Sequence, residues 1–173
     1  MATDHEPMGT AAPPVPGEGD HLRGSGPEAI VYLDLACPRC AGTWAEIARL
    51  PLRLCVRHFP MSAKRPRSPA LHAASEAAAV QSEEGFWLFW DSLLADRSHV
   101  DDPHLWERAE RFGLDLDRFQ RDRRSADVAA RVRRDFVSGI RAGVTETPSG
   151  FTASGPLRGD LAEQLRVLAE AGS

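Results

Sequence analysis

The stretch Cys37-Pro38-Arg39-Cys40 is the most informative part of this sequence, because of its place in the chain. It follows the apolar run IVYLDLA (residues 30–36), which predicts a buried strand, and precedes AGTWAEIARL (residues 41–50), which is compatible with a helix. Two thiols in this spacing at a strand-to-helix junction can close a small disulfide ring. The first thiol then lies at a helix N-terminus, where unpaired N–H groups and the helix dipole favour the thiolate. The junction therefore predicts thiol–disulfide exchange.

Two other interpretations of the cysteine pair stay open at this point, a zinc half-site and two buried structural cysteines. A structural zinc site normally takes four ligands, often from two such pairs. Beyond the pair, only Cys55 remains in the sequence. The count of cysteines therefore favours a redox pair over a metal site.

Size and composition indicate an ordinary globular protein with one domain. The chain has 173 residues, of which 42% are hydrophobic and 27% charged, enough for a substantial core. Its net charge is −4, and its arginine-rich stretch near 118–141 is interleaved with aspartates, so nucleic acid is not an expected partner. No run approaches the roughly 18 apolar residues of a membrane span.

The first 27 residues are expected to form a disordered N-terminal tail. Residues 1–27 are rich in proline, glycine, alanine and acidic side chains and lack an apolar block. A secretory signal would show a basic start and then roughly 7–15 apolar residues. We therefore expect a cytoplasmic protein, a setting in which a CxxC pair is catalytic or redox-sensing more often than structural.

The rest of the chain predicts an α/β protein with an inserted block of helices. Residues 52–59 form the second strand, which gives a β-α-β unit of the size of a parallel crossover. Asp160 begins the last helix, with Glu163 completing a capping box. Between them we expect helices at 70–81, 83–94, 103–112 and 126–141, a short turn at 116–121, and two short strands at 147–153 and 156–158.

This order carries a family resemblance in five segments, at residues 34–40, 57–60, 85–87, 112–115 and 143–148. Their sequences are DLACPRC, RHFP, GFW, FGLD and GVTETP. Together they resemble the DsbA family of thiol–disulfide oxidoreductases, and most closely a bacterial branch of which some members are fused to sodium/proton antiporters. One departure is Glu146, which stands where relatives usually have glycine.

The resemblance implies a thioredoxin fold with an inserted α-helical domain. The first half of that fold, with the CxxC, is expected at 28–64, the helical insertion at 65–142, and the second half at 143–173. The second half would carry a cis-proline loop, with Pro148 cis after Thr147 and facing the active site, followed by the C-terminal helix.

The cysteines are then expected to have separate roles. Cys37 is the nucleophile, because it is the cysteine nearest the helix start. Cys40, more buried and with the higher pKa, is the resolving thiol that releases the substrate. Between them Pro38 and Arg39 are supporting residues, and Arg39 is expected to add a cation that stabilises the Cys37 thiolate.

Three further expectations concern side chains around the pair. Asp34 is either a partly buried acid that relays a proton to or from Cys40, or a solvent-facing strand residue. Cys55 is expected to pack as a small core hydrophobe. The histidines show no metal spacing among themselves (His58, His72, His99, His104).

The leading functional prediction is an oxidoreductase that exchanges disulfides with protein or small-thiol substrates and is recycled by a redox partner. It needs neither a metal nor an organic cofactor, because its own cysteine pair holds the electrons. One alternative is a redox-inactive thioredoxin-fold module that docks a protein partner. Another is a dimer that binds zinc through a CxxC from each chain.

Overall fold

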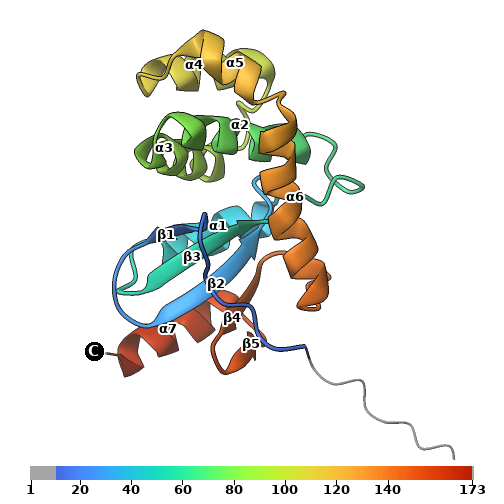
Figure 1. Ribbon diagram of the computed structural model, residues 1–173. Coiled ribbons are helices and arrows are strands. Elements are labelled where there is room, and N and C mark those ends of the chain that lie inside the picture. The colour runs from blue at the N-terminus through green and yellow to red at the C-terminus, as the bar shows by residue number, and fades with distance from the viewer. Residues whose placement is uncertain (1–10, 173) are drawn as a thin grey trace, which may run out of the picture.

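A five-stranded mixed sheet lies at the centre of the computed structural model, which describes residues 11–172 (Figure 1). Its order is β1-β3-β2-β4-β5, so the first long strand of the chain lies in the middle. β2 pairs in parallel with β3 and antiparallel with β4. The strands are β1 (His21–Arg23), β2 (Glu28–Leu33), β3 (Arg53–His58), β4 (Ser149–Thr152) and β5 (Gly155–Leu157).

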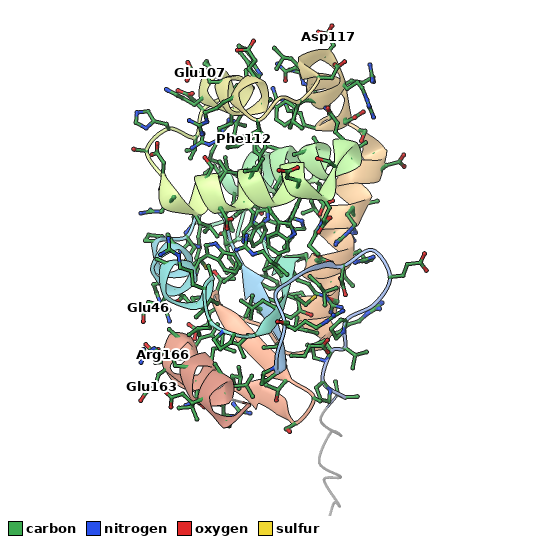
Figure 2. The ribbon with its side chains drawn as sticks, turned by 90° about the vertical axis from the view of Figure 1, so that its left-hand side faces the viewer. Glu46, Glu107, Phe112, Asp117, Glu163 and Arg166 are labelled. Atoms are coloured by element: carbon green, nitrogen blue, oxygen red, sulfur yellow. The ribbon has the colours of Figure 1, made fainter. Side chains whose placement is uncertain are left out.

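Alternating side chains of β2 bury both faces of the sheet. Val31 and Leu33 face the larger hydrophobic cluster, together with α1 (Pro38–Ile47) and α7 (Leu161–Ala171). The latter two helices pack side by side, and an ion pair of 3.2 Å joins Arg166 to Glu46, both labelled in Figure 2. Ile30 and Tyr32 face the opposite side, so the strand that leads into the CxxC is held from both directions.

The helical block stands at one end of the sheet, in two layers (Figure 1). α2 and α3 pack against each other, α4 and α5 lie beyond them, and α6 runs from this block down beside β3. Phe112, labelled in Figure 2, contacts the ring of Phe89 between the layers. The bounds are α2 (Ser68–Gln81), α3 (Glu83–Ala95), α4 (Asp102–Arg111), α5 (Leu116–Asp122) and α6 (Ala126–Arg141).

From β2 onward the predicted element order is confirmed, with small differences at the ends of the elements. The expected turn at 116–121 is a short helix, capped by the Asp115 side chain. The last helix is capped by Asp160, which accepts from the Glu163 N–H. Among the described residues, no helix combines the length and the apolar character that crossing a bilayer requires.

The expectation of a disordered tail is wrong for residues 11–27, while residues 1–10 lie outside the described part of the chain. His21–Arg23 form β1, which pairs antiparallel with β3. Three arginines hold the segment before it: Arg57 donates to the Val15 carbonyl, Arg134 to that of Glu18 and Arg131 to that of Gly19. These contacts come from β3 and α6, so the segment's own composition could not reveal them.

α6 approaches the sheet closely at Gly139. A Cβ atom there would lie 2.7 Å from the ring of Phe59 and 3.0 Å from that of Tyr32. Both rings are buried, so neither has room to withdraw. Glycine at this position lets the helix lie directly on the sheet beside the end of β3.

Candidate active site

Cys37 is the N-cap residue of α1, which starts with Pro38. Its backbone is extended (φ −88°, ψ 123°), and its Sγ accepts a hydrogen bond from the Cys40 N–H at 3.4 Å. Proline suits the first helical position because its missing N–H is one that the helix leaves unpaired in any case. The sequence therefore places one sulfur at the positive end of the helix dipole.

The two thiols of the motif have opposite acidities. Both are buried and both are free thiols. The hydrogen bond from Cys40 is the largest influence on Cys37 and lowers its pKa; burial opposes this, and the Cys40 N–H lowers it further. Burial raises the pKa of Cys40, and the neighbouring Cys37 sulfur adds to the rise. The structure thus separates a thiolate from a protonated thiol, in the directions expected of a nucleophile and a resolving thiol.

The Thr147–Pro148 peptide bond is cis, as predicted. The Thr147 carbonyl oxygen lies 3.8 Å from Cys37 Sγ, across 110 residues of sequence. The loop between α6 and β4 therefore lies directly beside the nucleophile, and Thr147 is itself buried. Cys37, Cys40, Thr147 and Pro148, predicted separately along the chain, are brought together at one end of the sheet.

We expected Arg39 to lower the Cys37 pKa, but the cation among the main influences on that pKa is Arg65. The Arg39 side chain is 68% exposed and lies 3.6 Å from the Glu146 carboxylate. Arg65, from the loop before α2, is less exposed and also lies 3.4 Å from the Asp34 carboxylate. Arg65 gave no sequence signal, since it lies 28 residues after Cys37 in an irregular loop.

Asp34 is fully buried, so the solvent-facing alternative is wrong. Its carboxylate accepts from the Ala36 N–H, the Met61 N–H and the Ser68 hydroxyl, at 2.5 to 3.1 Å. Burial alone would raise its pKa, but the hydrogen bonds from the Ser68 hydroxyl and the Ala36 N–H are among the influences that lower the pKa to about 2. Its own N–H lies 3.4 Å from Cys40 Sγ and donates to it. The Asp34 backbone therefore contacts the Cys40 sulfur, while its carboxylate is held in the core by donors from three other residues.

A row of titratable side chains leads from Asp34 through the core, and we call it the buried histidine chain. His72 Nε2 lies 3.5 Å from Asp34 Oδ1, and His72 Nδ1 lies 2.7 Å from His58 Nδ1. His58 Nε2 lies 2.6 Å from Glu76 Oε1, which lies 2.7 Å from His21 Nε2. His21 Nδ1 then lies 2.9 Å from Glu83. Only Glu83 reaches solvent, with 55% of its side chain exposed.

Within the described residues, three members of this chain have ligand atoms spaced closely enough for a metal ion, His21, His58 and Glu76. Hydrogen bonding uses those atoms instead. The Leu35 N–H donates to His72 Nε2 at 3.1 Å, and burial lowers the His72 pKa to about 4, so this ring is neutral with its hydrogen on Nδ1. His58 Nδ1 must then accept, which puts the His58 hydrogen on Nε2, facing Glu76. A protonated nitrogen is no metal ligand.

Sequence reasoning missed the buried histidine chain. Its members come from β1, β3, α2, α3 and the residue that follows β2, and only His72 and Glu76, on one face of α2, share a helical spacing. His21 gave no signal, because it lies in the predicted tail. The available hint was His58, a polar residue at the end of β3, which needs a partner when it is buried.

Comparisons with known proteins find similarity of sequence to longer proteins. No family model matches. The chain is 37% identical over 158 residues to a Na(+)/H(+) antiporter NhaA of Herminiimonas arsenicoxydans, covering 85% of this chain and 24% of that protein. It is 33% identical over 146 residues to NhaA 3 of Salinispora tropica, covering 80% of this chain and 22% of that protein. The chain thus spans about a quarter of the length of these curated relatives.

Solved structures resemble the chain over almost its whole length. Wolbachia pipientis alpha-DsbA2, a thiol-disulfide exchange protein, matches with a TM-score of 0.79 at 17% identity, covering 90% of this chain and 88% of its own. Oxidised BdbD of Bacillus subtilis matches with a TM-score of 0.78 at 14% identity, covering 94% and 96%. These likenesses confirm the predicted fold class, since identity this low speaks for the fold alone.

Proposed function

We propose that this chain, which has the DsbA-like thioredoxin-superfamily fold, is a thiol–disulfide oxidoreductase whose electrons are held by Cys37 and Cys40. The observation that carries the proposal is the pairing of unlike thiols at the start of α1. Cys37 Sγ accepts the Cys40 N–H, and its pKa is lowered while that of Cys40 is raised. This difference in pKa is what the exchange requires, because the nucleophile must be a thiolate while the resolving thiol stays protonated until it attacks.

The reaction proceeds in two exchange steps. The Cys37 thiolate attacks a substrate disulfide, forming a bond from Cys37 Sγ to one substrate sulfur, while the other leaves as a thiolate with the bonding electron pair. Cys40 then loses its proton and attacks Cys37 Sγ, forming the Cys37–Cys40 disulfide and releasing the second substrate thiolate. The substrate gains two electrons and the protein loses two. Run backwards, the same steps oxidise a substrate dithiol.

Substrate positioning is assigned to Thr147 and Pro148. The Thr147 carbonyl lies 3.8 Å from the attacking sulfur, so an extended peptide beside the loop would pass within reach of Cys37. Protein disulfides are therefore the substrate class that this arrangement serves best, with a redox partner that restores the starting state of the cysteine pair.

Two standard assays test the proposal, reduction of insulin disulfides by dithiothreitol and reoxidation of a reduced, unfolded protein. The wild-type chain should accelerate at least one of them, and Cys37→Ser should abolish that acceleration. Cys55→Ser is the matched control, because Cys55 is buried in β3, on the sheet face opposite the pair. A Cys37→Ser protein that turns over as fast as wild type would overturn the mechanism.

A further inference from the structure

The buried histidine chain connects the redox centre to the surface without an apolar interruption. Asp34, His58 and His72 have no exposed surface, and His21 and Glu76 are 5% exposed. Each neighbouring pair lies within 2.6 to 3.5 Å. Burying so many ionisable groups is costly unless they are paired, and as a purely structural device an apolar core would serve as well. Their continuity therefore suggests a use.

From His72 to Glu76, the hydrogens of this chain point the same way. The Leu35 N–H fixes His72 Nε2 as an acceptor facing Asp34, which leaves the hydrogen on Nδ1 to be donated to His58. His58 in turn donates from Nε2 to Glu76. A proton that enters at His72 Nε2 therefore displaces one hydrogen per ring and emerges at Glu76. No ring has to turn over during this passage, which leaves both rings in the opposite tautomer.

The outer end is a cation held between two carboxylates. His21 contacts Glu76 through Nε2 and Glu83 through Nδ1, so both nitrogens must donate and the ring is an imidazolium. Burial works against that charge, but the carboxylates outweigh it and raise the His21 pKa. Glu83 opens this end to water.

We propose that the buried histidine chain carries the proton of Cys40 to solvent when Cys40 attacks the mixed disulfide. The inference rests on the proposed function and adds a route for the proton that the second exchange step must remove. Asp34, whose backbone N–H contacts Cys40 Sγ, receives the proton on its carboxylate, whereas His72, His58, Glu76 and His21 act through it as positioning residues.

The step balances as follows. Cys40 Sγ gives its proton to the Asp34 carboxylate and forms the bond to Cys37 Sγ, and the substrate sulfur leaves with the electron pair. Asp34 returns to its ionised state by passing the proton to His72 Nε2. His72 then protonates His58 through Nδ1, and His58 protonates Glu76 through Nε2. A neutral Glu76 no longer stabilises the His21 imidazolium, which releases its Nδ1 proton to Glu83 and water. One proton leaves Cys40 and one enters solvent.

Other charges face the chain and set its electrostatics. Arg65 lies 3.4 Å from Asp34, and Arg131 lies 4.0 Å from Glu76 Oε1. Asp135 pairs with Arg131 at 2.7 Å and also accepts the His58 N–H. Hydrogen bonds to Asp34 and Glu76 outweigh the effect of burial and lower the pKa of each acid, so both are ionised before the step, which is the state able to receive a proton.

Ellman's reagent separates the two exchange steps in one stopped-flow trace. The reduced protein releases a first thionitrobenzoate when Cys37 forms the mixed disulfide, and a second when Cys40 resolves it. Glu76→Gln keeps the size of the side chain but cannot take up a proton, and His72→Gln interrupts the chain nearer the thiols. His99→Gln, a surface histidine whose side chain is 56% exposed, is the matched control.

In Glu76→Gln and His72→Gln we expect an unchanged first phase and a second phase slowed by about tenfold or more at neutral pH. The second phase should recover as the pH rises, because hydroxide can replace the lost route. His99→Gln should behave as wild type. A purely structural role would not give a defect that alkaline pH repairs. Second phases equal to wild type across the pH range would overturn the inference.

A measurement on the unmodified protein covers the case in which the variants fail to fold. The rate of the second phase is followed in mixtures of H2O and D2O. Several protons moving together predict a curved dependence on the deuterium fraction, and a straight line or no dependence would contradict the route. Absence of any first phase would instead contradict the proposed function itself, so the two failures are distinguishable.

Discussion

Asp20 Oδ2 lies 2.8 Å from Arg57 Nη2, in an ion pair whose carboxylate side chain is 1% exposed and whose arginine side chain is 10% exposed. Arg134 of α6 approaches the same carboxylate at 2.9 Å. The pair joins the segment before β1 to β3, and α6 closes over it. Asp20, which lies in the predicted disordered tail, is thus part of the packed fold.

Replacing Asp20 should therefore destabilise the protein. Asp20→Ala leaves the Arg57 guanidinium buried without its carboxylate, a change that costs about 3–5 kcal/mol in comparable pairs. Urea unfolding followed by circular dichroism measures it. Glu28→Ala is the control, because its pair with Arg53 is about half exposed and should contribute roughly 0–1 kcal/mol. Equal losses in the two variants would show that the segment is not anchored through Asp20.

Two helical glycines should respond to alanine with opposite signs. Gly139→Ala places a Cβ atom 2.7 Å from the Phe59 ring and should cost about 1–3 kcal/mol. Gly42→Ala in α1 meets nothing within 4 Å and should gain roughly 0.5–1 kcal/mol from helix propensity. Thermal melting of both variants is the test. If Gly139→Ala were as stable as wild type, α6 would not lie against the sheet as described.

The Cys37 thiol should ionise well below the free-thiol pKa of about 8.5. Thiolate absorbance near 240 nm, followed against pH, gives the midpoint. Cys40→Ala removes the strongest hydrogen bond to the Cys37 thiolate and should raise this midpoint. Arg65→Met removes the nearby cation and should raise the midpoint as well. Arg39→Met, at an exposed position facing Glu146, is the comparison and should change it less. A midpoint at or above 8.5 would remove Cys37 as the activated nucleophile.

The same acidity should appear in the redox potential. A stabilised Cys37 thiolate favours the dithiol form, which makes the disulfide the stronger oxidant. Equilibration against glutathione buffers should give a potential less negative than the value of about −270 mV that is typical of thioredoxin. A more negative potential would indicate that the thiolate is not stabilised relative to the disulfide.

Acid should destabilise the fold in a window set by His72. Burial lowers the pKa of this histidine from 6.5 to about 4, so between these values the unfolded chain binds a proton that the folded chain excludes. Stability must then fall as the pH drops from about 6.5 to 4. The His21 pKa is raised above 6.5, so this residue affects stability only above pH 6.5. There the folded chain keeps a proton that the unfolded chain has lost, and the stability from that proton is lost as the pH rises further. Urea midpoints across this range should show the slope in wild type and His99→Gln, and a weaker slope in His72→Gln.

The sequence predicts those site residues whose roles follow from their neighbours in the chain, and leaves open those whose surroundings come from distant segments. The roles of Cys37 and Cys40 could be predicted from local sequence, because a strand, two thiols separated by two residues and a helix start follow one another. The cis conformation of Pro148 was predicted from the resemblance of residues 143–148 to the DsbA family. Asp34 stayed ambiguous because an acid at a strand end fits either solvent or a polar pocket. Only the donors from Met61 and Ser68 decide between them.

The parts that escaped prediction are held by contacts between distant segments. His21 meets Glu76 across 55 residues, and Arg131 reaches the carbonyl of Gly19 across 112. A three-residue strand has too few positions to show an alternating pattern. Its pairing with β3 is stabilised by partners elsewhere in the chain, which hydrophobic periodicity does not report.

Cys55 gives the protein a practical advantage for labelling. It lies inside β3 with no exposed surface, and burial raises its pKa to about 12. Alkylating reagents attack thiolates, so at neutral pH its protonated state protects this sulfur. Cys37 is equally buried but has a lowered pKa, so a fluorophore or cross-linker added to the native, reduced protein should modify Cys37 first. Spectroscopic probes can therefore be attached to the proposed nucleophile without first removing the third cysteine.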